Sequence, residues 1–226
     1  RIDADNESPS VWAESGANLG GVARQVALRG LAGMEWAATI PGTVGGAVYG
    51  NAGAHGGDTA GSLLLAEILH PEQSRVEWSA AEMDYGYRSS TLKRNRCQAV
   101  VLAARFKLEQ STPEVVRSRM DANTTNRRRT QPPGASLGSM FKNPPGDYAG
   151  RLIEAAGLKG ARVGSASISS VHANFFVTEA GATAADIVQL IEMARSTVAD
   201  RFGVHLELEI ELLGSWNQHS NELVKD

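Results

Sequence analysis

Side chains that could stabilise negative charge or move a proton include Arg88, Ser139, Glu207 and Glu209, among many of the same types. A guanidinium stays cationic and offers a planar fork of donors, which suits Arg88 to a carboxylate. A serine hydroxyl held over a carbon can deliver a proton to it, and a protonated carboxyl can donate a hydrogen bond. The residue types alone leave simpler roles open: a surface arginine in a turn, a capping serine, and edge-strand charges that oppose aggregation.

The segment 39–57 could hold a nucleotide cofactor because it is crowded with glycines, at positions 42, 45, 46, 50, 53, 56 and 57. Without Cβ atoms, their backbone N–H groups can approach a phosphate or a flat ring, and Thr43 or Asn51 can add a polar contact. A regular helix would not tolerate so many glycines comfortably, so we predict a long, close-fitting loop. The spacing matches neither the P-loop nor the Rossmann fingerprint, so a purely structural loop remains an equal alternative.

The elements around these residues follow from hydrophobic periodicity and from turn and cap signals. In the first half we predict a strand at 10–14, a helix at 18–29, strands at 63–70, 75–78 and 99–108, and a helix at 112–126. A second loop, 131–138, contains two prolines and a glycine and is typical of a domain boundary. In the second half we predict a short strand near 140–141, a helix at 147–156, strands near 161–168 and 174–178, a helix at 184–202 and a final strand at 206–213. This order predicts an α+β or mixed α/β fold.

The composition is that of an ordinary globular protein, with 226 residues, 42% hydrophobic and 21% charged content. The single cysteine, Cys97, lies beside an apolar run, which predicts a buried thiol in a reducing cytosol. No apolar stretch approaches the roughly 18 residues of a membrane span, and no signal-peptide pattern opens the chain. We therefore expect a cytoplasmic protein.

The charges exclude nucleic-acid binding as a first interpretation, because the net charge is 22 − 25 = −3 and no broad basic stripe is present. The one dense basic run, Arg127, Arg128 and Arg129, indicates either a solvated helix end or a cluster for a phosphate group. The five histidines and the cysteine have no metal-ligand spacing, so we predict no metal site.

Six segments stand in a fixed order along the chain. They are the pair Pro-Gly-x-Val-Gly-Gly-Ala and Asn-Ala-Gly-Ala-x-Gly (41–56), Gly-Tyr-Arg-Ser-Ser (86–90), Gly-Ser-Met-Phe-Lys-Asn-Pro-Pro-Gly (138–146), Ala-Gly-Arg-Leu-Ile-Glu-Ala-Ala-Gly-Leu-Lys-Gly (149–160), His-Ala-Asn-Phe (172–175) and Leu-Glu-Leu-Glu-Ile (206–210). Each segment alone is a weak signal. Together they resemble the UDP-N-acetylenolpyruvoylglucosamine reductases, and the resemblance extends over residues 10–214.

The resemblance implies an α+β chain of two domains. Residues 1–110 would be part of an FAD-binding domain of the PCMH-like, mixed α/β type, 111–214 a C-terminal α+β substrate-binding domain, and 215–226 a polar tail. The family carries a further N-terminal stretch whose glycine- and asparagine-bearing loop holds the flavin pyrophosphate. The sequence opens directly ahead of a predicted strand, so we expect this stretch to be missing from it.

The resemblance also implies the reaction. NADPH would reduce FAD, and the reduced flavin would pass hydride to C3 of the enolpyruvyl ether of a UDP-sugar to give UDP-N-acetylmuramate, in peptidoglycan precursor synthesis. In that reaction Arg88 would stabilise the enolate, Ser139 would deliver a proton to C2, and Glu209, the second glutamate of its motif, would be the catalytic acid. The expected partners are the UDP-sugar enolpyruvyl ether and NADPH. No nucleic acid, membrane or obligate protein partner is expected.

Two further sets of residues are implied by the same motifs. The residues expected to hold the cofactor are Pro41, Gly42, Thr43, Gly45, Gly46, Asn51, Ala52 and Gly53. The residues expected to bind substrate are Tyr87, Lys142, Asn143, His172 and Asn174. For His172 a structural role is an equal alternative, and Lys142 and Asn143 could also lower the cost of a transient alkoxide at Ser139.

Two other functions remain possible from the residues. One is a non-catalytic nucleotide-sugar-binding fragment. The other is a different flavin oxidoreductase that acts on an alcohol, but the family motif at 138–144 disfavours this second alternative. Leu137 departs from the family pattern, where a small residue is expected two places before Ser139. No segment resembles the tyrosine-bearing loop of one subgroup, so the likeness is closer to the subgroup that lacks it.

Overall fold

The computed structural model describes residues 1–5, 8–95 and 98–214, and it divides the chain into two compact units. Unit 1 is Arg1–Arg127 and unit 2 is Arg128–Asp226. The predictions for Cys97 and for the tail at 215–226 lie outside the described residues. The assignment of cofactor binding to 1–110 and of substrate binding to 111–214 stays a prediction.

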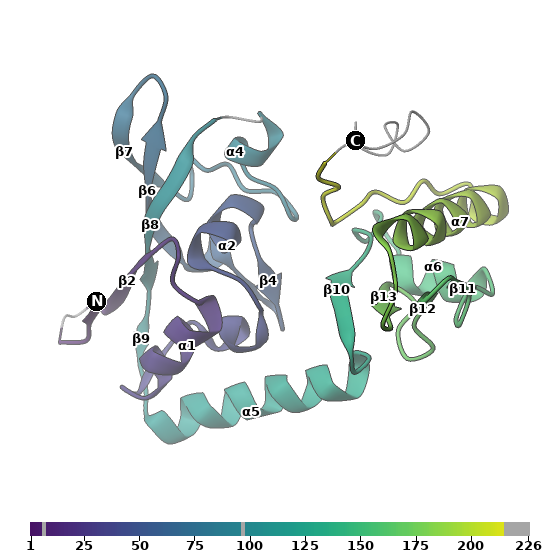
Figure 1. Ribbon diagram of the computed structural model, residues 1–226. Helices are drawn as coiled ribbons and strands as arrows, with labels where there is room; N and C mark the ends of the chain where they lie inside the picture. The colour runs from purple at the N-terminus through teal and green to yellow at the C-terminus, as the bar shows by residue number, and fades with distance from the viewer. Residues whose placement is uncertain (6–7, 96–97, 215–226) are drawn as a thin grey trace. The chain divides into compact units, whose positions relative to one another are not determined.

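Unit 1 is built on a five-stranded antiparallel sheet of order β1-β2-β8-β6-β7 (Figure 1). Its strands are β1 (Ile2–Asp3), β2 (Ser10–Glu14), β8 (Val100–Lys107), β6 (Leu63–His70) and β7 (Ser74–Ser79). Every predicted strand of this half is confirmed. Along each strand, side chains that face the core alternate with side chains that face outward, as with Ala66 and Ile68 of β6, which are both buried. Burial of this inner face stabilises the sheet.

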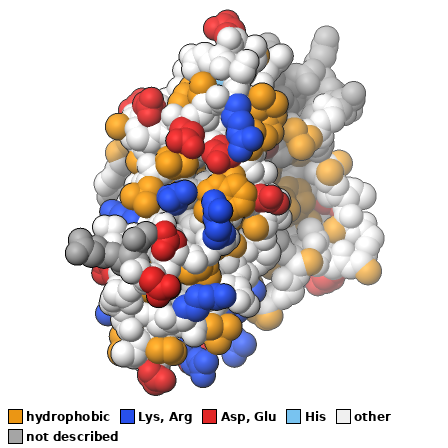
Figure 2. Space-filling model, turned by 90° about the vertical axis from the view of Figure 1, so that its left-hand side faces the viewer, with side chains coloured by type: hydrophobic (Ala, Val, Ile, Leu, Met, Phe, Trp, Pro, Cys, Tyr) orange, Lys and Arg blue, Asp and Glu red, His pale blue; other side chains and the backbone are white. Residues whose placement is uncertain are grey.

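One face of this sheet is covered by helices, among them α1 (Leu19–Ala27). The predicted helix is confirmed. It begins at Asn18, whose side chain accepts a hydrogen bond from the Gly21 amide at 2.7 Å, and it buries apolar residues at helical spacing: Leu19, Ala23 and Val26. The opposite side of the sheet, shown in Figure 2, interleaves acidic, basic and hydrophobic side chains.

The segment 39–57 is not one long loop, so this prediction is wrong. The short elements of this region are β3 (Leu31–Ala32), the 3-10 helix η1 (Glu35–Thr39), α2 (Val44–Gly50), β4 (Gly53–Ala54), β5 (Gly57–Asp58) and α3 (Thr59–Ser62). Strands β4 and β5 form a hairpin, and β3 pairs with β9 (Glu109–Gln110).

Packing explains why α2 forms despite its glycines. The residues on its inner side, Val44, Ala47 and Val48, are buried, and the Thr43 hydroxyl caps its first turn by accepting from the Gly46 amide. Glycine is required at position 45 because a Cβ there would lie 2.9 Å from the Cβ of Ser15. Burial of one apolar face therefore outweighs the low helix propensity of glycine.

Helix α5 (Pro113–Thr130) follows the sheet and runs past the division between the units. It starts where predicted but continues through the basic run, four residues beyond the predicted end at 126. Its first half belongs to unit 1, where Val116 and Met120 pack with Ala27 and Ala32. The short helix α4 (Thr91–Arg94) completes the unit.

Unit 2 has a four-stranded antiparallel sheet of order β10-β13-β12-β11. Its elements are β10 (Ala135–Ser139), α6 (Ala149–Ala155), β11 (Arg162–Val163), β12 (Ala166–Ile168), β13 (Phe175–Thr178) and α7 (Ala184–Phe202). Both predicted helices are confirmed, and α7 has a capping box between Thr183 and Asp186. The predicted strand at 161–168 is a hairpin. Helices and antiparallel sheets together give the predicted α+β class.

Two predictions in unit 2 are wrong. Residues 135–138 form most of β10 instead of a loop, because the edge of β13 offers them backbone partners. The segment 206–213 is not a strand; its pairing is a single bridge between Leu208 and Phe141. The Glu207 carbonyl and the Glu209 amide hydrogen-bond to the backbone of Lys142 and Met140, and a contact this short does not make a strand of the alternating apolar pattern.

In the part of the chain that the structure describes, no helix is long and apolar enough to cross a membrane. Across the same described residues, no group of three or more acidic, histidine or cysteine side chains is arranged to hold a metal ion.

Candidate functional site

In unit 1 the predicted catalytic Arg88 lies against the glycine-rich segment. Its Nη2 donates a hydrogen bond to the Gly53 carbonyl at 2.9 Å, and its guanidinium carbon lies 5.2 Å from the ring centre of Tyr87. The backbone of Arg88 is left-handed, with φ of 52°, a conformation that disfavours residues with a Cβ. The fold therefore holds this cation in a strained turn beside one of the predicted cofactor residues.

The turn that carries Arg88 is tied to the end of α2 and the residues after it. Asn51 Nδ2 donates to the Gly86 carbonyl at 2.9 Å, and Asn51 Oδ1 accepts from the Ala60 amide at 3.0 Å. The Ser90 hydroxyl donates to the Tyr49 carbonyl at 2.6 Å. A second side chain near the turn, Tyr85, donates to the Val48 carbonyl, and burial raises the pKa of its hydroxyl.

Asn51 was expected to contact the cofactor, and the structure gives its side chain another task. It is 5% exposed, and both ends of its amide are engaged by backbone groups of the protein. Ala52 is similar, since its amide donates to Ala47 and its carbonyl accepts from Thr59. We propose that Asn51 positions the Arg88 turn instead of touching a ligand.

Asn51→Asp tests this role. The ionised carboxylate cannot donate to the Gly86 carbonyl, so we expect a loss of about 1–3 kcal/mol in the free energy of unfolding. Denaturant titration followed by circular dichroism measures the loss. Asn18→Asp is the matched control, because aspartate caps a helix as well as asparagine does, and it should leave stability unchanged. Equal stability of the two variants would show that the Asn51 amide does not stabilise the turn that carries Arg88.

The glycines of the segment 39–57, which include the predicted cofactor residues Gly42, Gly45, Gly46 and Gly53, fall into two classes. A Cβ on Gly53 would lie 2.8 Å from the Cβ of Asp58, so this glycine, like Gly45, is needed for packing within the protein. The amide of Gly45 donates to the Ser15 carbonyl at 2.8 Å and is therefore not free to bind a phosphate, contrary to the prediction.

The second class leaves space for a ligand. A Cβ on Gly42, Gly50 or Gly56 would meet no atom within 4 Å, and one on Gly46 would meet only the Thr43 hydroxyl, at 3.6 Å. Pro41, Gly42 and Thr43 are exposed. This is backbone that a flat ring can approach closely, so the residues fit FAD by contact with open backbone.

In unit 2 a cavity of about 370 Å³ is lined by residues from three of the motifs. Its walls include the predicted residues Ser139, Asn143, His172 and Asn174. Within the described residues, no group forms a hydrogen bond with the Ser139 hydroxyl, although Ser139 is half-buried. The cavity therefore presents an unengaged hydroxyl beside three residues that were expected to bind substrate.

His172 is held as a neutral ring. Its Nδ1 accepts a hydrogen bond from the Asn174 amide at 3.2 Å, and its ring packs edge-on against Phe175 at 5.0 Å. Burial lowers the pKa of His172. A neutral imidazole whose Nδ1 accepts carries its proton on Nε2, so His172 offers a donor to a ligand in the cavity. Gly150 allows this packing, because a Cβ there would lie 2.8 Å from the ring.

The backbone that follows Ser139 is flanked by the glutamate segment. The Glu209 amide donates to the Met140 carbonyl, and the Lys142 amide donates to the Glu207 carbonyl, each at 2.9 Å. The Lys142 ammonium pairs with the Glu207 carboxylate. The structure therefore brings Glu209 next to the Ser139 strand, and it separates the two glutamates that spacing could not distinguish.

Lys142 is less suited to a diphosphate than expected. Its charge is matched by Glu207, and it does not line the cavity described above. Arg127 is also engaged, since its guanidinium donates to the Thr39 carbonyl at 2.6 Å and burial lowers its pKa. Arg127 thus helps to attach α5 within unit 1, whereas Arg128 and Arg129 are exposed at the end of this helix, as the predicted solvated helix end implies.

Tyr148 and Arg151 line the same cavity and were missed from the sequence. Both lie at the start of α6, and Arg151 pairs with Asp147, whose pKa its guanidinium lowers to about 2. Arg151 lies within the 149–160 motif, which could have drawn attention to it, whereas Tyr148 falls between the 138–146 and 149–160 motifs and has no such signal.

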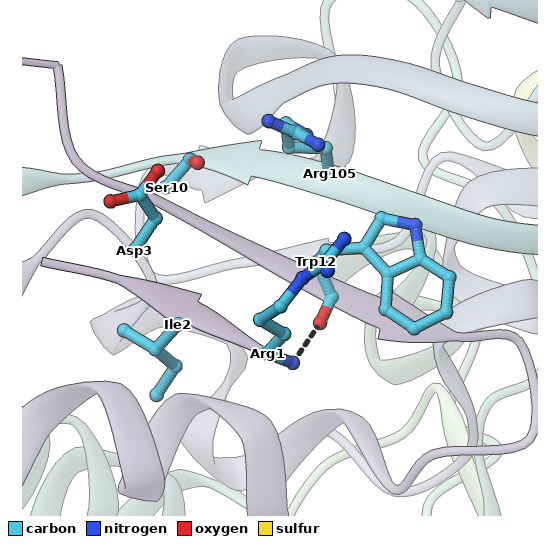
Figure 3. A pocket seen from close by; sticks show the side chains of 6 residues that line it. All are labelled: Arg1, Ile2, Asp3, Ser10, Trp12 and Arg105. Carbon is cyan, nitrogen blue, oxygen red and sulfur yellow. Dashed lines mark hydrogen bonds between the residues drawn. The ribbon is translucent and has the colours of Figure 1, made fainter. Parts of the chain in front are cut away.

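Figure 3 shows a different cavity, of about 340 Å³, at the edge of the unit 1 sheet. The side chains of Trp12 and Arg105 lie there on neighbouring strands, and the Arg1 amino group donates to the Trp12 carbonyl at 2.7 Å. None of the predicted site residues lines it. We assign it no part in the reaction.

The predicted site residues thus form two groups. Unit 1 brings Tyr87 and Arg88 to Gly53, and unit 2 brings Ser139 together with the cavity residues and with Glu209. That both groups act on one substrate remains a prediction.

Comparison with known proteins gives a consistent result. A family model described as UDP-N-acetylenolpyruvoylglucosamine reductase, C-terminal domain, matches residues 130–213, and a model described as FAD binding domain matches residues 1–68. The UDP-N-acetylenolpyruvoylglucosamine reductase of Chloroflexus aggregans is 52% identical over 210 residues, which are 92% of this chain and 71% of that protein. That of Bacillus subtilis is 41% identical over 210 residues, 92% of this chain and 69% of that protein.

A solved structure agrees with these matches. The crystal structure of UDP-N-acetylenolpyruvylglucosamine reductase from Thermus caldophilus superposes with a TM-score of 0.79 at 38% identity. The superposition covers 89% of this chain and 71% of that one.

Proposed function

The chain belongs to the UDP-N-acetylenolpyruvoylglucosamine reductase family, and from that premise we propose that it reduces the enolpyruvyl ether of UDP-N-acetylglucosamine to UDP-N-acetylmuramate. It is a flavin-dependent oxidoreductase with FAD as its cofactor. NADPH is the proposed source of electrons. We place the reaction in the cytoplasm, in the synthesis of peptidoglycan precursors, with the UDP-sugar and NADPH as its partners.

One structural observation supports this proposal more than any other. Ser139 and Asn143 come from one motif and His172 from another, yet they line a single cavity in unit 2. The cavity combines an unengaged hydroxyl, an amide and a neutral imidazole, which suits a polar substrate that must receive a proton.

The residues of this chain have separate tasks in the proposed reaction. FAD, once reduced, supplies the hydride that adds to C3 of the enolpyruvyl group. Arg88 stabilises the negative charge that then develops on the enolate and its carboxylate, because its guanidinium offers two donors to the two oxygens. Ser139 donates its proton to C2, and the Glu209 carboxyl hydrogen-bonds to the enolate oxygen.

The glycine-rich segment and the unit 2 cavity have binding roles. Gly42, Gly46, Gly50 and Gly56 would accept the flavin against bare backbone. His172 would donate from Nε2 to the UDP-sugar, and Asn143 is already oriented by its Oδ1, which accepts from the Ala149 amide at 3.1 Å. These two side chains would fix the substrate relative to Ser139.

The purified full-length protein tests the function directly. We expect it to be yellow, to lose its flavin absorbance when NADPH is added without oxygen, and to recover it when the enolpyruvyl UDP-sugar follows. A colourless protein that still binds the UDP-sugar would contradict an enzymatic role and favour a nucleotide-sugar-binding fragment. If a carbonyl compound derived from an alcohol reoxidises the reduced flavin and the UDP-sugar does not, the protein is a different flavin oxidoreductase that acts on an alcohol.

A further inference from the structure

Asn174 makes an unusual set of contacts with the residues that follow Ser139. Its side-chain Oδ1 accepts from the Phe141 amide at 2.9 Å, and its Nδ2 donates to the Phe141 carbonyl at 2.7 Å. Its backbone carbonyl accepts from the Met140 amide at 2.8 Å. The Asn174 side chain therefore takes the place of a neighbouring strand for Phe141.

These contacts engage both polar atoms of the Asn174 side chain. Asn174 is 2% exposed, so its amide forms part of the cavity wall but has both ends turned to the Phe141 backbone. It was expected to bind substrate, and this prediction does not fit its geometry. A ligand could reach the amide only by displacing two buried hydrogen bonds.

The same contacts fix the path of the chain at Ser139. Strand β10 has an irregularity in its register with β13 between Ser136 and Ser139, and Ser139 is the last residue of β10, where it pairs with Phe175. Beyond this pair, residue Met140 is held on both sides, by the Asn174 carbonyl at its amide and by the Glu209 amide at its carbonyl. The Asn174 side chain then locks Phe141, one residue further on.

We propose that Asn174 is a positioning residue that fixes Ser139 against the reacting carbon, while its side chain makes no contact with substrate. The inference rests on the proposed function. The amide can both accept from Phe141 N–H and donate to Phe141 C=O, whereas an ionised carboxylate can accept but cannot donate.

Asn174→Asp is the sharpest test, because it changes one atom and removes one of the two bonds. In the full-length protein we expect flavin reduction by NADPH at the normal rate. Reoxidation by the UDP-sugar should slow about 10²-fold, since misplacement of a catalytic group by about 1 Å has an effect of that size. The loss should fall on kcat and leave KM nearly unchanged.

A pH profile adds a readout that loss of stability alone would not produce. A protonated carboxyl at position 174 can donate to the Phe141 carbonyl again, so the defect should shrink as the pH is lowered. Val198→Ala is the matched control: Val198 is fully buried in the same core of unit 2, so its truncation destabilises the unit but leaves both hydrogen-bonding groups of the Asn174 side chain in place. It should reoxidise normally at every pH.

The outcomes separate the inference from the function. If the unaltered protein is not reoxidised by the UDP-sugar, the proposed function fails. If it is reoxidised and Asn174→Asp keeps its rate, the inference alone fails. A higher KM with unchanged kcat would show direct substrate contact. A defect equal to that of Val198→Ala, without recovery at low pH, would reduce Asn174 to a structural residue.

Discussion

Ser139→Ala should leave flavin reduction by NADPH intact but slow reoxidation of the reduced flavin by the UDP-sugar about 10²–10⁴-fold, the usual contribution of a positioned proton donor. The reason is that the Ser139 hydroxyl lines the unit 2 cavity and is the proposed donor to C2. Single-turnover measurements in the full-length protein separate the two half-reactions, because each changes the flavin absorbance in the opposite direction.

Ser136→Ala is the control for this experiment. Ser136 lies on the same strand, is exposed, and does not line the cavity, so its removal should change neither half-reaction. Normal turnover by Ser139→Ala would remove Ser139 from the mechanism. A slowed reduction by NADPH would instead mean that the substitution disturbs the flavin site.

Arg88→Ala and Arg88→Gly should lose activity equally while differing in stability. Both variants remove the guanidinium, so reoxidation by substrate should slow about 10²–10³-fold, as for loss of a charge-stabilising donor. Both also lose the bond to the Gly53 carbonyl. The backbone of Arg88 is left-handed, so the alanine variant keeps the strain of a Cβ and should be less stable than the glycine variant by about 1 kcal/mol.

Denaturant unfolding and single-turnover kinetics of the two variants check this pair of effects. Equal stability would show that the turn at Arg88 relaxes when the side chain is removed. Near-normal reoxidation in either variant would contradict the role of Arg88 as the cation that stabilises the enolate.

The elements that the sequence predicts correctly have local signals and strong periodicity. Helix α7 has a capping box at Thr183 and a glycine at its end, and strand β6 alternates between core and surface. The Asn18 cap of α1 is equally plain. Such signals depend on residues a few positions apart, so they can be read without knowledge of the fold.

The errors arise where a distant partner decides the local structure. Helix α2 forms because its apolar face packs on the unit 1 core, and glycine propensity predicts the opposite. Strand β10 exists because β13 lies beside it, whereas residues 206–213 have the pattern of a strand and little to pair with. The strand propensity of a segment does not show which sheet edges have backbone groups available to pair with it.

The site residues show the same limit. The motifs singled out Asn51 and Asn174 and suggested ligand contact for both. The structure turns each amide toward a backbone segment, at Gly86 in one case and Phe141 in the other. A sequence pattern does not distinguish an amide that binds a ligand from one that supports the residue that does.

The central claim is that Arg88, Ser139 and Glu209 act on one enolpyruvyl group beside the flavin. A crystal structure of full-length Ser139→Ala with oxidised FAD and the UDP-sugar tests it most directly, because this variant should bind substrate without turning it over. We predict the Arg88 guanidinium at the substrate carboxylate, the position 139 Cβ facing C2, and the Glu209 carboxyl within about 3.2 Å of the enolpyruvyl group. Substrate bound with any of these three positions remote from the enolpyruvyl carbons would contradict the claim.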